Sequence, residues 1–234
     1  MIPLRSDLPI RQAPVVTLLI IGINVYVYLK AILLGPWAGH RLILYYGLIP
    51  CGLTGNCDIA GRVFSPEVTL LTSMFVHAGF LHVAGNMLYL WIFGANVEVS
   101  MGKARYTIFY LLCGLGAAFT QIIVSPAWQV PMVGASGAIS GVLGAYLLLF
   151  PRARVLTLIP LGLFTRLAEI PATIVLGFWI VVRLFNGLLT FNFAGRGVAW
   201  FAHVGGLAAG MLLVGVFNQR LVPWGWPKRR LWYE

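Results

Sequence analysis

The chain has 234 residues, of which 60% are hydrophobic and only 9% are charged, and its mean hydropathy is +0.90. Soluble domains carry about a quarter charged residues, so this composition excludes an ordinary soluble domain and indicates a membrane protein. We attribute the net charge of +10 to membrane topology and to attraction for anionic lipid. It does not indicate nucleic-acid binding, because no basic run is interleaved with an exposed aromatic platform.

Six apolar stretches have the length that a membrane-spanning helix needs. They lie at about 14–34, 79–99, 105–125, 134–150, 168–190 and 198–218. We therefore expect an all-α membrane protein, a single domain over residues 1–234 that forms a bundle of six transmembrane helices. The first stretch is too long and uninterrupted for a cleavable signal peptide and lacks an A-x-A-like exit, so we expect it to be retained.

Lysine and arginine residues are unevenly distributed between the two sides of these spans. One side receives eleven and the other four, with Arg183 inside the fifth span. Since positive residues accumulate on the cytoplasmic side, both termini are expected to be cytoplasmic. The segment 35–78 then forms a long extracytoplasmic loop that is partly embedded in the membrane. We expect a bacterial plasma membrane over a mitochondrial one, because we see no Arg- and Ser-rich presequence.

Two of the three cysteines, Cys51 and Cys57, lie in this long outer loop. A disulfide on an oxidising face and two free thiols are both open. A metal site with His40 or Asp58 has no supporting ligand spacing, and we expect no metal or other cofactor. Cys113, inside the third span, is most simply a packing residue.

The fourth span begins with a Gly-x-Ser-Gly tetrapeptide, and the helix that follows Ser136 is too short to cross a bilayer. The fifteen residues from Ser136 onward climb only about 22 Å at 1.5 Å per residue, whereas the hydrocarbon core is about 30 Å thick. Ser136 is therefore expected below one membrane face. Non-helical backbone at that depth must be covered by protein or line a water-filled cavity. A serine on a Gly-rich turn in such a pocket is a candidate nucleophile.

Three of the four histidines, His77, His82 and His203, fall in the outer ends of predicted spans. Ionisable side chains in a membrane are costly and usually face a cavity. His203 lies about five residues into the sixth span, roughly 8 Å below the outer face and at about the depth of Ser136. A serine nucleophile needs such a base within hydrogen-bond reach. No acidic residue is placed to complete a triad, so the sequence allows only a Ser-His dyad.

The second span offers donors for an oxyanion, because His82 and Asn86 share one helical face at i, i+4. The helices carrying Ser136 and His203 are rich in small residues that let backbones approach closely. Each of these residues alone has an ordinary packing explanation, and an intramembrane histidine is as often an interhelical hydrogen bond as a catalytic group. Their combination favours a catalytic site.

These segments together resemble the rhomboid family of intramembrane serine proteases, in its six-helix bacterial form. The matching residues are His77, His82 and Asn86 in HAGFLHVAGN, Gly94, Glu98 and Gly102 in GANVEVSMG, Gly134, Ser136 and Gly137 in GASG, and His203, Gly206 and Gly210 in AHVGGLAAG. They occur in the family's order, and the resemblance covers all six spans.

The resemblance implies that Ser136 is the nucleophile and His203 the general base, with His82 and Asn86 as oxyanion donors and His77 as a support. Gly134 and Gly137 would support the turn at Ser136. The resemblance also implies structural roles for Gly94, Glu98, Gly102, Gly206 and Gly210. It further implies that a transmembrane substrate enters sideways, past a gate formed by the fifth helix and the segment 191–197. Ser140 stands where some members place an aromatic that stacks on the catalytic histidine.

Three functions are open on the sequence. The first is an intramembrane endopeptidase that cleaves the transmembrane segments of other proteins. The second is a non-catalytic rhomboid-like protein that binds client helices; such relatives typically lose the serine or histidine that this chain keeps. A transporter is disfavoured because no inverted repeat or midplane charge is seen. Arg183 is expected to snorkel to the interface.

Overall fold

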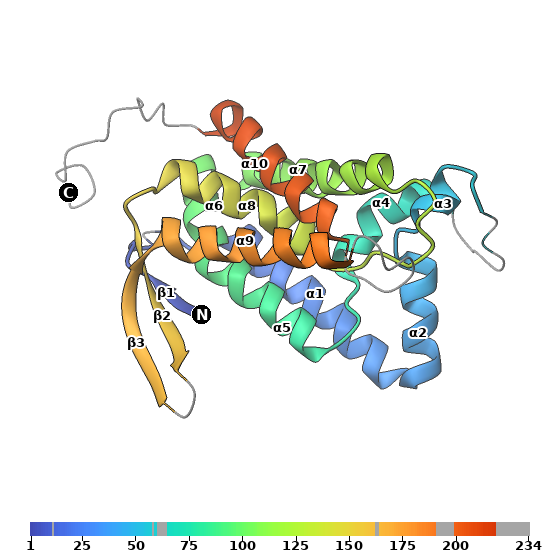
Figure 1. Cartoon of the computed structure of the whole chain (residues 1–234), viewed down its shortest axis with the longest axis horizontal. Coiled ribbons are helices and arrows are strands. Elements are labelled where there is room, and N and C mark those ends of the chain that lie inside the picture. The colour runs from blue at the N-terminus through green and yellow to red at the C-terminus, as the bar shows by residue number, and fades with distance from the viewer. Residues whose placement is uncertain (11, 58, 60–64, 162–163, 191–198, 219–234) are drawn as a thin grey trace.

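Long helices run along the long axis of the molecule, and three short strands lie at one end (Figure 1). The computed structural model describes residues 1–10, 12–57, 59, 65–161, 164–190 and 199–218. In chain order the elements are β1 (Ile2–Ser6), α1 (Val15–Leu33), α2 (Gly35–Tyr46), α3 (Pro50–Leu53), η1 (Pro66–Val68), α4 (Thr69–Thr72), η2 (Ser73–Phe75), α5 (Phe80–Tyr89), the π-helical turn η3 (Leu90–Gly94), α6 (Ala95–Met101), α7 (Lys103–Val124), α8 (Ser136–Leu149), β2 (Arg154–Leu161), β3 (Phe164–Pro171), α9 (Ala172–Thr190) and α10 (Trp200–Phe217).

The helices confirm the predicted all-α membrane bundle. Within the described residues, four helices are long and apolar enough to cross a membrane: Val15–Leu33, Phe80–Met101, Lys103–Val124 and Trp200–Phe217. Two shorter apolar helices, Ser136–Leu149 and Ala172–Val182, fall within the expected fourth and fifth spans. Each of the six predicted stretches therefore contains one principal helix or helical segment.

The sheet was not predicted, and it corrects the expected start of the fifth span. Residues 168–171 belong to β3 instead of a helix, so α9 begins only at Ala172. β2 pairs with β3 and, on its other edge, with β1, all antiparallel. Val155 and Thr157 are buried while their neighbours along β2 are more exposed, which is the period-two pattern of a strand. The sheet joins the N-terminal strand to the connection between α8 and α9.

Glu98 links the second span to the start of α1. Its carboxylate oxygens accept the backbone N–H groups of Val16 at 2.9 Å and Thr17 at 2.7 Å. These are N-terminal donors of a helix, and Pro14, at the N-cap position, supplies no side-chain cap. Glu98 is buried, and these charge-assisted hydrogen bonds offset the cost of placing its carboxylate away from water.

The two glycines of the same motif occupy positions that a side chain would disturb. A Cβ at Gly94 would lie 2.7 Å from the Tyr106 hydroxyl oxygen. Gly102 has a φ of +83° at the junction of α6 and α7, where a residue with a Cβ is strained. The fold around the second span therefore depends on Gly94 for a close contact with Tyr106, on Glu98 for the cap of α1 and on Gly102 for the turn into α7.

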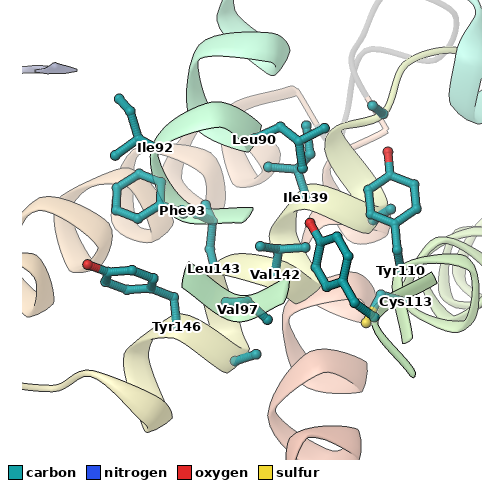
Figure 2. Close-up of a cluster of buried hydrophobic side chains, with 14 of the residues drawn as sticks. Leu90, Ile92, Phe93, Val97, Tyr110, Cys113, Ile139, Val142, Leu143 and Tyr146 are labelled. Atoms are coloured by element: carbon teal, nitrogen blue, oxygen red, sulfur yellow. The ribbon is translucent and has the colours of Figure 1, made fainter. Parts of the chain in front are cut away.

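A buried apolar cluster fastens α8 to the second span. Leu90, Phe93 and Val97 face α8, as Figure 2 shows. Phe93 contacts the Tyr146 ring edge to face, with centroids 4.9 Å apart. Cys113 is buried in the same cluster, in agreement with a packing role. Because α8 carries Ser136 at its first position, this cluster also positions the serine.

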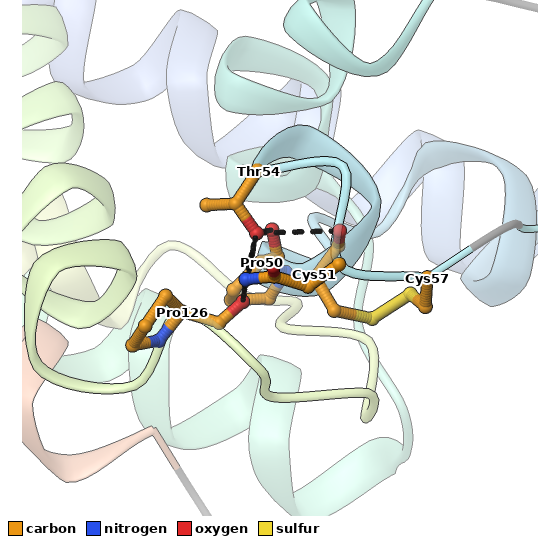
Figure 3. The surroundings of a disulfide bond; sticks show 6 residues. Pro50, Cys51, Thr54, Cys57 and Pro126 are labelled. Atoms are coloured by element: carbon orange, nitrogen blue, oxygen red, sulfur yellow. Dashed lines mark hydrogen bonds between the residues drawn. A yellow bond between two sulfur atoms is a disulfide. The ribbon is translucent and has the colours of Figure 1, made fainter.

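Cys51 and Cys57 form a disulfide, which decides between the alternatives left open by the sequence (Figure 3). The bridged segment is fastened to the connection between α7 and α8. Thr54 Oγ1 donates to the Pro126 carbonyl at 2.9 Å, and Cys51 N–H donates to the Trp128 carbonyl at 3.0 Å. The bridged segment therefore packs against the chain that leads into Ser136.

Candidate active site

The turn before α8 places Ser136 at the first position of that helix. Gly134 has a φ of +114°, a conformation that favours glycine, and its N–H donates to the Ser73 carbonyl at 2.9 Å. A Cβ on Gly134 would lie 2.6 Å from His82 Nε2. Glycine is thus required here both for the turn and for the close approach of His82.

His203 lies one turn into α10 and meets Ser136 directly. Its Nε2 is 2.9 Å from Ser136 Oγ, although the residues are 67 apart in the chain. The His203 ring is only 4% exposed, whereas Ser136 is half-buried. An imidazole nitrogen at this distance from a serine hydroxyl is the geometry that nucleophilic catalysis requires of its base.

Glycines set the distance between the two helices that carry this pair. A Cβ at Gly206 would overlap the carbonyl oxygen of Gly137, and one at Gly210 would overlap the carbonyl oxygen of Gly141. A Cβ at Gly137 would in turn lie 2.7 Å from the Ala117 Cβ of α7. The backbones of α8 and α10 are therefore in contact, as small-xxx-small faces permit.

Asn86 and His77 meet beside the turn that carries Ser136. Asn86 Nδ2 is 2.9 Å from His77 Nε2, and the N–H of Ala135 points at the same nitrogen at 3.4 Å. Both partners are N–H donors, so His77 Nε2 is the acceptor and the ring proton is on Nδ1. His82 packs edge to face on His77, with centroids 5.0 Å apart.

His77 is held neutral at this position. It precedes α5, and burial, with a further contribution from the neighbouring His82, lowers the pKa of His77 to about 3. A neutral ring keeps its Nε2 lone pair across the neutral and mildly acidic range. One amide hydrogen of Asn86 is thereby fixed on His77, which orients the second hydrogen for another acceptor.

The Rhomboid domain family model matches residues 66–220, well over half of the chain and all of the residues just described. The chain belongs to the rhomboid family. It is similar to Rhomboid protease GluP of Bacillus subtilis, with 34% identity over 65% of this chain and 28% of that protein. RHOMBOID-like protein 1 of Arabidopsis thaliana is also 34% identical, over 74% of this chain and 42% of its own length.

A mitochondrial relative, Rhomboid protein 1 of Saccharomyces cerevisiae, is 28% identical over 62% of this chain and 40% of that protein. The matched region spans less than half the length of each of these three curated relatives. Rhomboids of bacterial and eukaryotic origin are thus similar to this chain.

Two tryptophans contact the catalytic histidine candidate of this rhomboid, and sequence reasoning missed both. Trp179 of α9 meets the His203 ring edge to face, and Trp200 of α10 lies against it at a tilt, each with centroids 5.9 Å apart. Ser140 does not take part, because its hydroxyl donates to the Ser136 carbonyl at 2.6 Å. Aromatic contact with His203 therefore comes from α9 and α10 instead of α8.

A signal for Trp200 existed in the sequence, since it stands three residues before His203 on one helical face. Trp179 had none, because its contact depends on how α9 packs. The Arg183 side chain and the expected gating segment 191–197 lie outside the described residues.

Proposed function

We propose that this rhomboid is an intramembrane serine endopeptidase that hydrolyses peptide bonds in transmembrane segments of other membrane proteins. The observation that carries the proposal is the 2.9 Å approach of His203 Nε2 to Ser136 Oγ. Family membership supports it, and one relative is named a protease. A rhomboid that only bound client helices would gain nothing from holding a serine against a buried histidine.

In the proposed reaction, Ser136 Oγ attacks the scissile carbonyl while His203 Nε2 takes its proton. The developing oxyanion receives hydrogen bonds from Asn86 Nδ2 and from the N–H of Ser136, with His82 beside them. His203 then protonates the leaving amine, and the acyl-serine is hydrolysed by water activated by the same base. Asn86 and His82 are thus proposed to stabilise the oxyanion, while Gly134 and Gly137 shape the turn.

We further infer one domain of the six-helix bacterial form, with both termini on the cytoplasmic side of a plasma membrane. The distribution of eleven positive residues against four supports this orientation. The sheet that contains β1 lies at the opposite end of the bundle from α3, which carries the Cys51–Cys57 disulfide (Figure 1). A disulfide at the far end suits an oxidising exterior.

A fluorophosphonate probe tests for an activated serine without a known substrate. Ser136 Oγ would attack phosphorus and expel fluoride, leaving a stable phosphonyl adduct. We expect the purified protein to be labelled at Ser136, and Ser136→Ala and His203→Ala to be unlabelled although both remain folded. A folded wild-type protein that is never labelled, in detergent or in lipid, would favour the non-catalytic alternative.

Replacing Asn86 by alanine is expected to lower kcat by about 10²–10³-fold, because an oxyanion donor acts mainly in the transition state. The KM for a transmembrane reporter should change little. His77→Ala, which leaves the Asn86 amide itself in place, should cost less. Since the pKa of His77 is lowered to about 3, its loss should leave the acid limb of the pH–rate profile in place. A rise in KM without a fall in kcat would contradict this role for Asn86.

Trp179→Ala is expected to slow labelling of Ser136 by roughly 3–10-fold, because an edge-to-face contact contributes about 0.5–1.5 kcal/mol. Trp179→Phe keeps an aromatic edge against His203 and should retain most of the rate. Equal labelling rates for the alanine and phenylalanine variants would contradict a role for the aromatic contact between Trp179 and His203.

A further inference from the structure

A pocket of about 320 Å³ lies far from Ser136, between the N-terminal segment and the second span. Residues 4–10 form one wall, and Trp91, Ile92 and Asn96 form the other. Asn96 lies five residues before the end of α6, so the pocket is near the end of the bundle that carries the sheet. In the proposed orientation this is the cytoplasmic leaflet.

Asn96 supplies a buried polar group with no protein acceptor. Its side chain is 6% exposed, and no described residue accepts a hydrogen bond from Asn96 Nδ2. An unsatisfied donor buried to this degree is costly, by roughly 1–3 kcal/mol. Native structures rarely keep such a group unless a ligand or water completes it. Asn96 is also one of the residues that line the pocket.

The charged groups at the same pocket have opposite signs. Arg5 contributes a guanidinium, which is suited to phosphate oxygens. Asp7 contributes a carboxylate; its Oδ1 accepts the Arg154 N–H at 2.9 Å, and its second oxygen can accept from another donor. A free anion would be attracted by Arg5 but repelled by Asp7. A zwitterion that carries a phosphate and an ammonium group satisfies both charges.

The remaining wall of the pocket is apolar. Trp91 is 47% exposed, and Leu8, Ile10 and Ile92 also line the pocket. Polar groups above an apolar wall match a phospholipid, whose headgroup sits at the interface while its chains lie deeper. Tryptophan is itself enriched at such interfaces.

We propose that this pocket binds the phosphoethanolamine headgroup of a cytoplasmic-leaflet phospholipid. The phosphate accepts hydrogen bonds from Asn96 Nδ2 and Arg5, and the ammonium donates to Asp7. Phosphatidylglycerol lacks the ammonium, and phosphatidylcholine has an ammonium that cannot donate a hydrogen bond. The site therefore distinguishes the three headgroups by chemistry. This inference uses the proposed membrane orientation but does not depend on proteolysis.

Native mass spectrometry of the delipidated full chain, with one added lipid at a time, tests the proposal. We expect phosphatidylethanolamine to be retained about tenfold more than either of the other two lipids, in line with a hydrogen bond to a charged group. Asn96→Leu should abolish that preference. Free phosphoethanolamine, added as a competitor, shows whether the headgroup alone is enough or the acyl chains are also needed.

Asp7→Asn keeps an acceptor for the Arg154 N–H but removes the charge, so it should lose discrimination between phosphatidylethanolamine and phosphatidylglycerol. Arg105→Ala removes an exposed positive charge on α7 that does not line the pocket, and should behave as wild type. Thermal unfolding of each variant checks that it is folded. Equal retention of all three lipids by the wild type, or unchanged preference in folded Asn96→Leu and Asp7→Asn, would overturn the proposal.

Discussion

Alanine at Ser136 is expected to lower cleavage of a transmembrane reporter by about 10⁴-fold or more, and alanine at His203 to do nearly the same. In the proposed mechanism the two groups act as one unit, because Ser136 Oγ is a strong nucleophile only while His203 Nε2, 2.9 Å away, accepts its proton. The double variant should therefore be no slower than either single variant. Initial rates in reconstituted liposomes provide the measurement.

Ser140→Ala is the matched control for this test. It removes a serine hydroxyl one turn further along α8, where the hydroxyl donates to the Ser136 carbonyl and does not reach His203. The control should stay within a few-fold of wild type. Residual turnover of Ser136→Ala near the wild-type rate would exclude the proposed mechanism, and so would additive losses in the double variant.

The second large effect concerns stability and comes from the helix contact beneath the site. Gly206→Ala is expected to lower the free energy of unfolding by roughly 2–4 kcal/mol. The added Cβ would overlap the Gly137 carbonyl oxygen, and backbone cannot move aside as a flexible side chain does. α10 must then shift away from α8, which separates His203 from Ser136. Labelling by the fluorophosphonate probe should fall together with stability.

Gly215→Ala, on the same helix, controls for the intrinsic effect of alanine. A Cβ at Gly215 meets nothing within 4 Å, so this variant should be neutral or slightly more stable because alanine favours a helix over glycine. Both variants can be compared by thermal unfolding in the same detergent. If Gly206→Ala were as stable as Gly215→Ala, the close backbone contact would not hold in solution.

Much of the candidate site could be predicted from the sequence because polar residues are expensive inside a membrane. A serine on a glycine turn, histidines at the outer ends of spans and an asparagine one turn from a histidine stand out against an apolar chain. Depth along a helix follows from residue count, and this placed Ser136 and His203 at similar levels. The structure brings their side chains within hydrogen-bonding distance.

The β2–β3 hairpin was missed because most of it lies in the connection between the expected fourth and fifth spans. Hydropathy alone also does not distinguish the apolar stretch from residue 168 onward from the start of a helix. The sequence also left open whether Cys51 and Cys57 are bonded, because their spacing is compatible with two free thiols as well as with the disulfide that the structure shows. Both contacts are local in the chain, since the bridged cysteines are six positions apart and Leu161 pairs with Phe164 at the hairpin, but neither has a distinctive hydropathy pattern.

By itself, the sequence determined that this is a membrane protein and that its fold is a helical bundle, and it singled out a few residues as candidates for chemistry. Those properties depend on composition, helix length and local spacing. Only the tertiary structure decided that Glu98 caps α1, that Trp179 contacts His203 and that Asn96 lines a pocket with the N-terminal segment. Each of these contacts depends on the angle and distance at which two helices or segments pack. That geometry joins residues far apart in the chain, and the local periodicity of the sequence does not report it.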